Sequence, residues 1–297
     1  MSGLTSVNWQ YAHELRFYCF RRTFSGGSSL RIFSAFCQGL EKLGLQEVDS
    51  HKKANVWVIW SLLWGGKMVA NKKFWDLARK KKIPVLVLDV GAIERGKTWK
   101  IAFNGLGKDC YFSPEATGIR RFPGMIRAKK WKPREPNVLI CLQNESSDLW
   151  AGMPSSQVWL ESIVPLIRQH SDRPIVVRPH PRFSIRLDLD CFKGQGVERS
   201  RNPAFIDDLL ISHYVLNWSS TASVGAAMKG IPVWTGPDSM ASAISQPLEF
   251  LEQTPCYDLN AWLEWLSWTE WTEEELRSGL AMEFLMMSPQ PLHLAIT

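Results

Sequence analysis

The sequence predicts an α/β protein with two Rossmann-like halves, built on doubly wound parallel sheets and facing one another across a cleft. Short runs rich in β-branched and aromatic residues alternate with amphipathic stretches of helical length, which is the pattern of βα units. Some of these runs are almost continuously apolar, as strands covered by helices on both faces are. The alternation is interrupted once, by the basic and proline-rich stretch 120–136, and then restarts. We therefore expect two domains joined near residue 125.

The first domain is expected to span residues 1–125 and to consist of successive βα units. The predicted strands cover 15–20, 55–60 and 83–89, and the predicted helices cover 30–43 and 71–81. Glycine-containing loops follow the first two strands, which is consistent with tight connections between a strand and a helix.

The second domain is expected to span residues 126–257, and a helical segment, 258–297, completes the chain. The predicted strands cover 137–142, 175–178, a stretch near 197 and a stretch beginning at 214, with helices over 158–170 and 205–211. In the last segment, helices are predicted over 258–287. We expect Asn260 to cap the first of them, and Thr272 with Glu275 to form a capping box. We expect these helices to pack back on the N-terminal domain.

Composition excludes several classes of protein. The 297 residues are 45% apolar, which is enough for buried cores, and no stretch approaches 18 uninterrupted apolar residues. Polar residues interrupt the N-terminus where a signal peptide would be apolar. The six cysteines show no C-x-x-C spacing, so neither a zinc site nor a disulfide framework is indicated. The sequence therefore predicts a cytoplasmic protein with no membrane segment, no metal and no cofactor.

A Ser/Thr-rich turn is the most informative motif. It joins the strand beginning at Tyr214 to a helix of small residues that ends at Lys229-Gly230. Free backbone N–H groups and the helix dipole converge where a strand leads into a helix, and they favour an anion there. The polar residues at this turn are Asn217, Ser219, Ser220, Thr221 and Ser223. The simpler interpretation, which stays open, is that these hydroxyls only cap the helix.

A second polar group follows the strand 175–178. Arg178, His180 and Arg182 alternate with two prolines that hold the chain in an extended turn. Ligands of open α/β sheets bind beyond the carboxyl ends of the strands, so these residues and the Ser/Thr turn are expected to form one pocket of diphosphate size. Gln143, directly after the strand 137–142, is a further candidate. The alternative is that both arginines are surface charges and His180 is a packed turn residue.

Two carboxylates follow the third strand of the first domain. Asp89 and Glu94 lie in a segment with two glycines and Arg95, again at a carboxyl edge. A partly desolvated carboxylate is a candidate general base, because burial raises its pKa toward neutral pH. Alternatively, Asp89 caps a turn and Glu94 pairs with Arg95. The sequence has no Walker loop, G-x-G-x-x-G, G-x-S-x-G or H-E-x-x-H, and Asp188-Leu-Asp190 is too short a match to assign a metal site.

The second half resembles the donor-binding domain of GT-B glycosyltransferases, and most closely the capsule-polysaccharide and Kdo-transferase type. The resemblance is carried by Arg178-Pro-His-Pro-Arg182, Ser219-Ser-Thr221 and Gly230-Ile-Pro-Val233. It implies a GT-B fold and transfer of a sugar from a nucleotide-sugar without a metal, the leaving diphosphate being neutralised by Arg178, His180 and the helix N-terminus. The chain departs from the family at Ala226-Ala227, where the family often has Glu-Ala and uses the carboxylate to hold the donor ribose.

The chain is also similar, more loosely, to phage-encoded glycosyltransferases, some relatives of which modify hydroxymethylated bases in DNA. The residues that carry this likeness are Asp89-Val-Gly, Asn104-Gly-Leu, Trp262-Leu and Trp271-Thr. Basic clusters at 72–82 and 120–134 also favour a polyanionic partner. The predicted function is therefore a glycosyltransferase that uses a nucleotide-sugar and acts on duplex DNA, in the cytoplasm of the host cell if the gene is phage-encoded. The alternatives are a polysaccharide-building glycosyltransferase and a non-catalytic nucleic-acid-binding protein.

Overall fold

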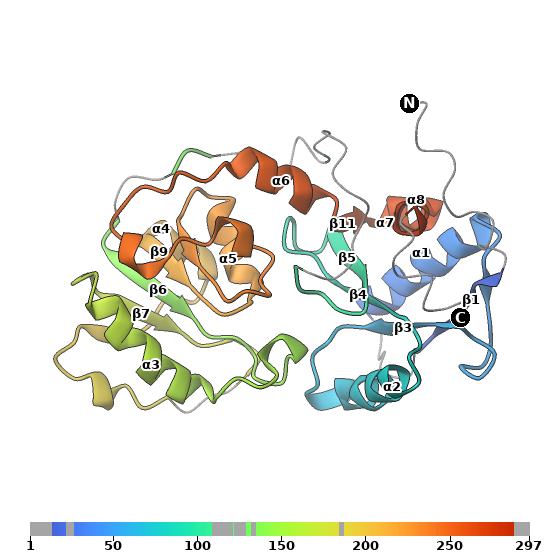
Figure 1. Cartoon of the computed structure of the whole chain (residues 1–297), viewed down its shortest axis with the longest axis horizontal. Coiled ribbons are helices and arrows are strands. Elements are labelled where there is room, and N and C mark those ends of the chain that lie inside the picture. The colour runs from blue at the N-terminus through green and yellow to red at the C-terminus, as the bar shows by residue number, and fades with distance from the viewer. Residues whose placement is uncertain are drawn as a thin grey trace. The chain divides into compact units, whose positions relative to one another are not determined.

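The computed structural model describes residues 14–21, 27–108, 121, 129–131, 135–183 and 187–287. These residues form two compact units (Figure 1). The first unit combines residues up to 121 with those from 264 onward, and the second comprises residues 122–263. The chain therefore leaves the first unit, forms the whole second unit and then returns. Most of the expected linker, 120–136, lies outside the described residues.

The first unit is built on a six-stranded sheet with the strand order β11-β5-β4-β3-β1-β2. Its strands are β1 (Arg16–Cys19), β2 (Gln46–Glu47), β3 (Val56–Trp60), β4 (Val85–Val90), β5 (Thr98–Phe103) and β11 (Glu270–Thr272). Its helices are α1 (Ser28–Lys42), α2 (Val69–Lys80), α7 (Glu273–Ser278) and α8 (Leu280–Met286). The βα pattern of the sequence is confirmed for the strands β1, β3 and β4 and for both helices between them.

Two strands of this sheet differ from the expected parallel arrangement. β5 pairs antiparallel with β4, and β11 pairs antiparallel with β5. β5 directly follows the turn after β4, and a strand that returns through a short connection must run in the opposite direction. The remaining strands, β2, β1, β3 and β4, are parallel neighbours. The first sheet is therefore mixed, with an antiparallel edge on a parallel core.

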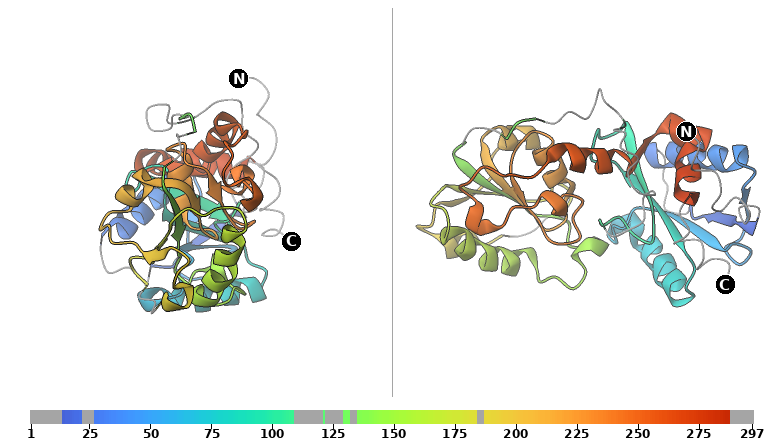
Figure 2. Two further views of the ribbon diagram at one scale, coloured as in Figure 1. Left: turned by 90° about the vertical axis from the view of Figure 1, so that its left-hand side faces the viewer. Right: turned by 45° about the horizontal axis from the view of Figure 1, so that its top comes forward.

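Helices cover both faces of the first sheet. α1 lies with α7 and α8 on one face and α2 lies on the other (Figures 1 and 2). The α1 and α7 backbones approach closely at Gly39, where an added Cβ would lie 2.1 Å from the Leu276 carbonyl oxygen. Trp271, Leu276 and Met282 are almost fully buried in the same core as α1. The C-terminal segment is thus an integral part of the first unit.

The expectation of helices throughout 258–287 was wrong in one part. A helix, α6 (Leu259–Ser267), is followed by the strand β11 before α7 begins. This strand has only three residues, Glu270–Thr272. Three residues are too few to show the two-residue periodicity of a strand, so a tryptophan-rich run here is indistinguishable from a helix in the sequence. The capping box of Thr272 and Glu275 is confirmed at the start of α7. At α6, the carboxylate of Asp258 accepts from the Asn260 N–H, so Asp258 takes the capping role expected of Asn260.

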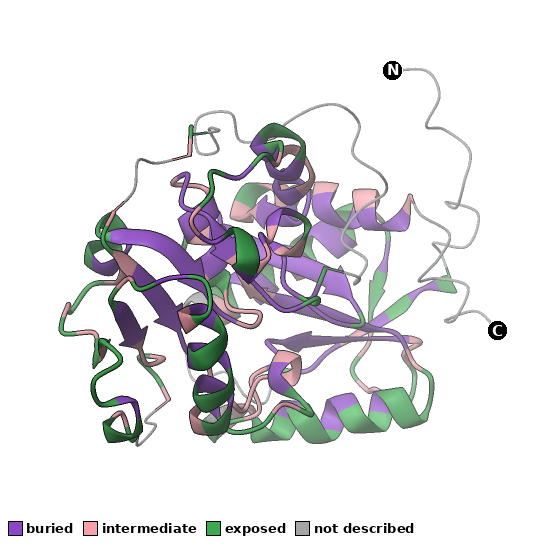
Figure 3. Cartoon of the chain, turned by 60° about the vertical axis from the view of Figure 1, so that its left-hand side comes forward, coloured by how far each residue is buried: buried purple, intermediate pink, exposed green. Residues whose placement is uncertain are grey.

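The second unit is built on a five-stranded, fully parallel sheet with the order β10-β9-β6-β7-β8. Its strands are β6 (Asn137–Cys141), β7 (Ile175–Arg178), β8 (Val197–Arg199), β9 (Ser212–Leu216) and β10 (Val233–Trp234). Its helices are α3 (Ser156–Arg168), α4 (Phe205–Leu210) and α5 (Thr221–Ala227), followed by α6 at its end. α3 covers one face, while α4 and α5 cover the other (Figure 2). The strands are largely buried (Figure 3).

Both sheets are therefore doubly wound, as the sequence predicts, and each unit has a hydrophobic core of its own. Carboxyl ends of neighbouring parallel strands lie at one edge of each sheet, and this edge is where ligands of such sheets bind. Among the helices of the described residues, none has the length and apolar character needed to cross a bilayer.

Candidate active site

Asp89 lies at the carboxyl end of β4, in the first unit. One carboxylate oxygen accepts from the Ser61 hydroxyl at 3.0 Å and the other from the Val90 N–H at 2.7 Å. Burial raises the pKa of the Asp89 carboxyl, and the two hydrogen bonds and the charge of Lys100 offset only part of this effect. Ser61 is held at φ 62°, a left-handed conformation that non-glycine residues rarely adopt and that is concentrated at functional sites. Asp89 therefore stays a candidate general base.

Glu94, the second candidate base, lies in a different environment. Its carboxylate forms an ion pair with Lys97, three residues further along the chain, and its side chain is 35% exposed. Its backbone carbonyl accepts from the N–H groups of Lys97 and Thr98, which closes a turn before β5. The Glu94 carboxylate is therefore engaged with a neighbouring cation at the surface, which is a common arrangement for a solvated side chain. Of the two acids, Asp89 is the stronger candidate.

Glu270, a residue that the sequence analysis did not select, fixes the loop between these two acids. Its side chain is fully buried, and its carboxylate accepts from the N–H groups of Ala92 and Ile93 at 2.6 and 3.1 Å and from the Thr98 hydroxyl at 2.6 Å. Gly91 leaves room for this contact, since a Cβ there would lie 2.3 Å from a Glu270 carboxylate oxygen. The sequence signal for a buried role of Glu270 is its position between Trp268 and Trp271, which are both buried in the structure.

The polar edge of the second sheet is formed where β6 and β9 end. Gln143 is buried, and its side-chain oxygen accepts from the N–H of Ser219 at 2.8 Å and from its hydroxyl at 3.0 Å. Ser220 caps α5 by accepting from the Ala222 N–H, and the hydroxyl of Ser223 donates to the Ser220 carbonyl. The structure therefore brings four of the candidate donor-binding residues together, although several of their polar groups serve the turn itself.

Two side chains at this edge carry buried polar groups without a partner among the described residues, Asn217 after β9 and Thr235 after β10, and Asn217 carries two such groups. Its side chain is fully buried, and neither its amide nitrogen nor its oxygen has a hydrogen-bond partner among the described residues. An unpaired buried polar group costs about 1–3 kcal/mol, so such groups usually bind a water molecule or a ligand. The adjoining backbone is fixed, because the Gly236 N–H donates to the Trp218 carbonyl at 2.7 Å. Asn217 is therefore a candidate ligand-binding group.

Arg178 ends β7 at the same carboxyl edge, but its guanidinium contacts protein groups. It forms an ion pair with the buried Asp208 of α4 and donates to the carbonyls of Asn202 at 2.9 Å and Pro203 at 3.0 Å. Asp208 is 1% exposed, so removing Arg178 would leave a buried carboxylate without its cation. Arg178 therefore has a structural role in this arrangement, and a role in binding phosphate stays a prediction.

His180, Arg182 and Thr221 lie nearer the solvent. The ring of His180 accepts from the Arg182 N–H at 3.2 Å, while the side chains of Arg182 and Thr221 are exposed. In the sheet, β6 separates β7 from β9, so the turn after Arg178 and the Ser/Thr turn belong to the same edge, two strand spacings apart. That distance is roughly 10 Å, from the usual spacing between strands. The residues thus share one edge of the sheet, and their joint binding of a diphosphate stays a prediction.

Of the basic residues in the stretch 120–134, the structure describes Arg121, Lys129 and Lys130. The two lysines are exposed, whereas Arg121 is not a surface charge. Its guanidinium is stacked 3.8 Å from the centre of the Trp271 ring, pairs with Glu275 and donates to the Glu270 carbonyl. Its side chain is 10% exposed. Arg121 therefore anchors the C-terminal segment to the first unit, and it should be removed from the set of residues expected to contact nucleic acid.

The two parallel-rich α/β sheets match those of GT-B-like glycosyltransferases, which confirms the predicted fold class. No protein-family model and no curated protein matches the sequence. Among solved structures, the chain is similar to Thermosulfurimonas dismutans KpsC, a beta Kdo 2,7 transferase. The TM-score is 0.50 at 16% identity, over 91% of this chain and 99% of that one. It is also similar to the beta Kdo 2,4 transferase of the same KpsC, with a TM-score of 0.50 at 14% identity, over 88% and 92%.

Proposed function

We propose that this protein is a glycosyltransferase that moves a sugar from a nucleotide-sugar donor to a hydroxyl of a saccharide acceptor. The observation that carries the proposal is the similarity to a Kdo transferase, which extends over nearly the whole of both chains. The polar edge of the second sheet, with the unsatisfied Asn217, supports a donor site there. The half-buried Asp89 supports an acceptor-activating base in the first unit.

The proposed reaction needs no bound metal. The Asp89 carboxylate takes the proton of the acceptor hydroxyl while the acceptor oxygen bonds to the anomeric carbon of the sugar. The bond between that carbon and the nucleotide phosphate breaks, and the phosphate leaves with its electron pair. The N–H and hydroxyl of Ser220 would bind the leaving phosphate, with His180 and Arg182 as further polar groups at the same edge. Arg178 would act indirectly, by holding α4 against the end of β7.

We favour a saccharide acceptor over the duplex DNA expected from the basic clusters. The relatives found by structure are transferases of the sugar Kdo, and Arg121 is buried inside the first unit. Exposed cations remain in both clusters, at the end of α2 in one and at Lys129 and Lys130 in the other, but Lys72 is paired with Asp76. These observations weaken the electrostatic argument for nucleic acid.

The proposal is tested by titration calorimetry with UDP-, GDP-, CMP- and ADP-linked sugars, including CMP-linked Kdo, followed by turnover assays with oligosaccharide acceptors. We expect saturable binding of one donor class without added metal, and unchanged turnover in a metal chelator. Absence of binding to every donor would contradict the proposal. Variants should be made at His180 and Arg182, because loss of Arg178 is expected to disturb the fold through Asp208.

The acceptor is tested separately with duplex DNA in a series of salt concentrations. A protein that recognises DNA through its phosphates loses affinity steeply as salt rises. We expect weak binding to DNA and no sugar transfer to duplexes with hydroxymethylated bases. Transfer to such a duplex would contradict the saccharide acceptor while leaving the glycosyltransferase assignment intact.

A further inference from the structure

Two cysteines and a glutamate that are distant in sequence meet in the first unit. Cys19 ends β1, Cys37 lies on α1 and Glu47 ends β2, and the two sulfur atoms are 3.6 Å apart. One ligand atom from each of the three residues lies within 4.8 Å of the others. Spacing in the sequence gives no sign of this cluster, because each residue belongs to a different element. The cluster shares no residue with the site of Asp89.

The geometry of the cluster suits a tetrahedral metal ion. Zinc bonds to thiolate sulfur at about 2.3 Å, so two sulfurs of a tetrahedral site are roughly 3.8 Å apart. The Cys19 and Cys37 sulfurs are already at 3.6 Å, and small rotations of these side chains would place a zinc ion between them. Two thiolates and one carboxylate, with a fourth position left for water or another ligand, form a donor set that zinc accepts in proteins.

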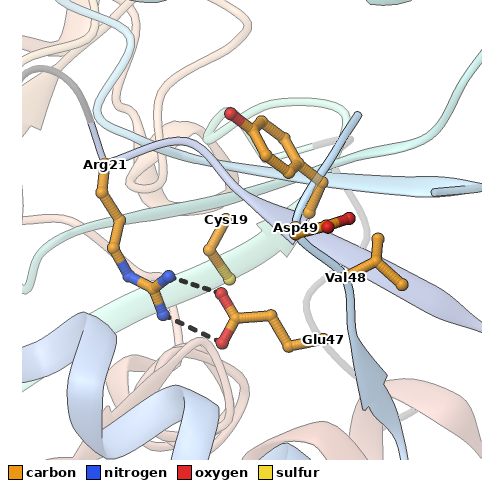
Figure 4. Close-up of a pocket in the computed structure, with 6 residues that line it drawn as sticks. Cys19, Arg21, Glu47, Val48 and Asp49 are labelled. Carbon is orange, nitrogen blue, oxygen red and sulfur yellow. Dashed lines mark hydrogen bonds and ion pairs between the residues drawn. The ribbon is translucent and has the colours of Figure 1, made fainter. Parts of the chain in front are cut away.

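A positive charge already occupies this position. The guanidinium of Arg21 forms an ion pair with Glu47 (Figure 4). One of its nitrogens lies 2.9 Å from the Cys37 sulfur and 2.9 Å from a Glu47 carboxylate oxygen. The cluster is therefore arranged around a cation, and a metal ion would have to displace the guanidinium. The Arg21 side chain is 42% exposed, so it can turn into solvent without unpacking the core.

The cluster is also accessible. A pocket of about 590 Å³ is lined by Cys19, Arg21, Glu47 and Asp49, among others. The sulfur of Cys19 and the carboxylate of Glu47 point toward one another beside this pocket (Figure 4). A metal ion could enter from the pocket, which Asp49, paired with Lys53, also lines.

We propose that Cys19, Cys37 and Glu47 form a binding site for a thiophilic divalent cation, with Zn²⁺ as the best-fitting ion and Arg21 as a competing internal cation. Binding would release the thiol protons, displace Arg21 from Glu47 and connect β1, α1 and β2. The proposal concerns a site distinct from the proposed glycosyltransferase chemistry and does not depend on it.

The experiment uses the reduced, metal-free, full-length protein. Zn²⁺ is titrated in competition with a chromogenic chelator, and Co²⁺ is added to a second sample to detect the charge-transfer absorption of thiolate bound to cobalt. We expect one Zn²⁺ per chain and a cobalt spectrum of a tetrahedral thiolate site. Absence of stoichiometric Zn²⁺ binding would overturn the proposal.

Variants identify the ligands. Cys37→Ser and Glu47→Gln should each weaken Zn²⁺ binding by at least about 100-fold, since even outer-shell changes cost 10–100-fold. Arg21→Gln should strengthen it by about 10-fold or more, because the competing cation is removed. Cys191→Ser, which changes an exposed cysteine in the second unit, is the matched control and should leave affinity unchanged.

Glu47 keeps the test decisive if the Cys37 variant misfolds, because its side chain is 30% exposed and lies on a short edge strand. Circular dichroism and thermal unfolding of every variant establish that it is folded. Zn²⁺ affinity that is the same in folded wild-type, Glu47→Gln and Arg21→Gln proteins would overturn the assignment of this site.

Discussion

Asp89 combines two properties that oppose one another. Its carboxyl is buried enough to raise its pKa, which suits a base but makes the ionised form costly in the folded protein. Because the pKa of Asp89 is higher in the folded protein than in the unfolded chain, its protonated form stabilises the fold. This stabilisation is fully present below the pKa of about 3.9 that Asp has in the unfolded chain, and it is lost as pH rises through the pKa of the folded protein. At neutral pH, the charged Asp89 therefore destabilises the first unit relative to a neutral residue of the same shape.

Asp89→Asn should separate catalysis from stability. We expect turnover to fall by about 100-fold or more, because the proton acceptor is lost, and the melting temperature at pH 7 to stay equal or rise. The difference in melting temperature should shrink as pH falls and the wild-type carboxyl becomes protonated. Turnover of the wild type should rise with pH through the raised pKa. Glu94→Gln is the control and should keep most of the activity, since Glu94 pairs with Lys97 at the surface.

Asn217, at the edge of the second sheet, also combines a cost in stability with a proposed role in binding. Asn217→Leu replaces an unpaired buried amide by an apolar side chain of similar volume, so we expect the free energy of unfolding to rise by about 1 kcal/mol. If Asn217 binds the donor, nucleotide-sugar affinity should fall at least 10-fold in the same protein. Calorimetric titration and denaturant unfolding measure the two effects. A stabilised variant that binds donor normally would show that Asn217 has no role in binding.

Some contacts of the candidate site can be predicted from the sequence and others cannot. The positions of Gln143, Ser219 and Ser220 at one edge follow from the rule that polar groups after parallel strands share that edge. The partner of Arg178 does not, because Asp208 is thirty residues further along the chain and only the packing of α4 brings the two charges together. The proximity of Cys19 and Cys37 is hidden in the sequence for the same reason. Long-range pairs of single residues leave no periodic pattern in a sequence.

The loop between β4 and β5 depends on an element that is distant in sequence. Glu270, at the start of β11, binds two N–H groups of this loop and the Thr98 hydroxyl. Glu270→Gln keeps the shape of the side chain but replaces one carboxylate oxygen by an NH₂ group. This NH₂ group would face the backbone N–H of Ala92 or Ile93, so two donors would meet. We expect a loss of about 2 kcal/mol or more of unfolding free energy and reduced turnover, because the loop adjoins Asp89.

The control for this change is Glu274→Gln, at an exposed position of the same acidic segment, which should alter neither quantity. Gly91→Ala offers an independent test, since its Cβ would collide with the Glu270 carboxylate and with Thr98. Full stability in both Glu270→Gln and Gly91→Ala would show that the contact does not hold the loop.

Elements with a strong periodic signal were predicted and the others were not. β7 was placed at its observed limits and α1 and α2 within two residues at each end, because a buried strand and an amphipathic helix have clear apolar patterns. β5 is not among the predicted strands, because Thr98 and Lys100 interrupt its apolar residues even though the whole strand is buried. The three residues of β11 are too few for periodicity. Tertiary pairing forms these two strands.

At the scale of the whole molecule, the first unit is assembled from two separated segments of chain. Trp268, Trp271 and Leu276 belong to its core, and β11 completes its sheet beside β5. Removal of residues 264–297 should therefore lower the stability of the first unit by several kcal/mol while leaving the second unit folded. Hydrogen exchange would show lost protection in β1, β3 and β4 and retained protection in β6 and β9. Equal loss in both units would contradict the division of the cores.

This division has a consequence for biosynthesis. Residues 122–263, which form the second unit, leave the ribosome before residues 264–287. The first unit is therefore incomplete while the second unit is being translated. Until Glu270–Thr272 are translated, the backbone of β5 is an open edge to which another nascent chain can add a strand. A pause in translation after residue 263 would prolong that exposure, and chaperone demand during synthesis should be concentrated there.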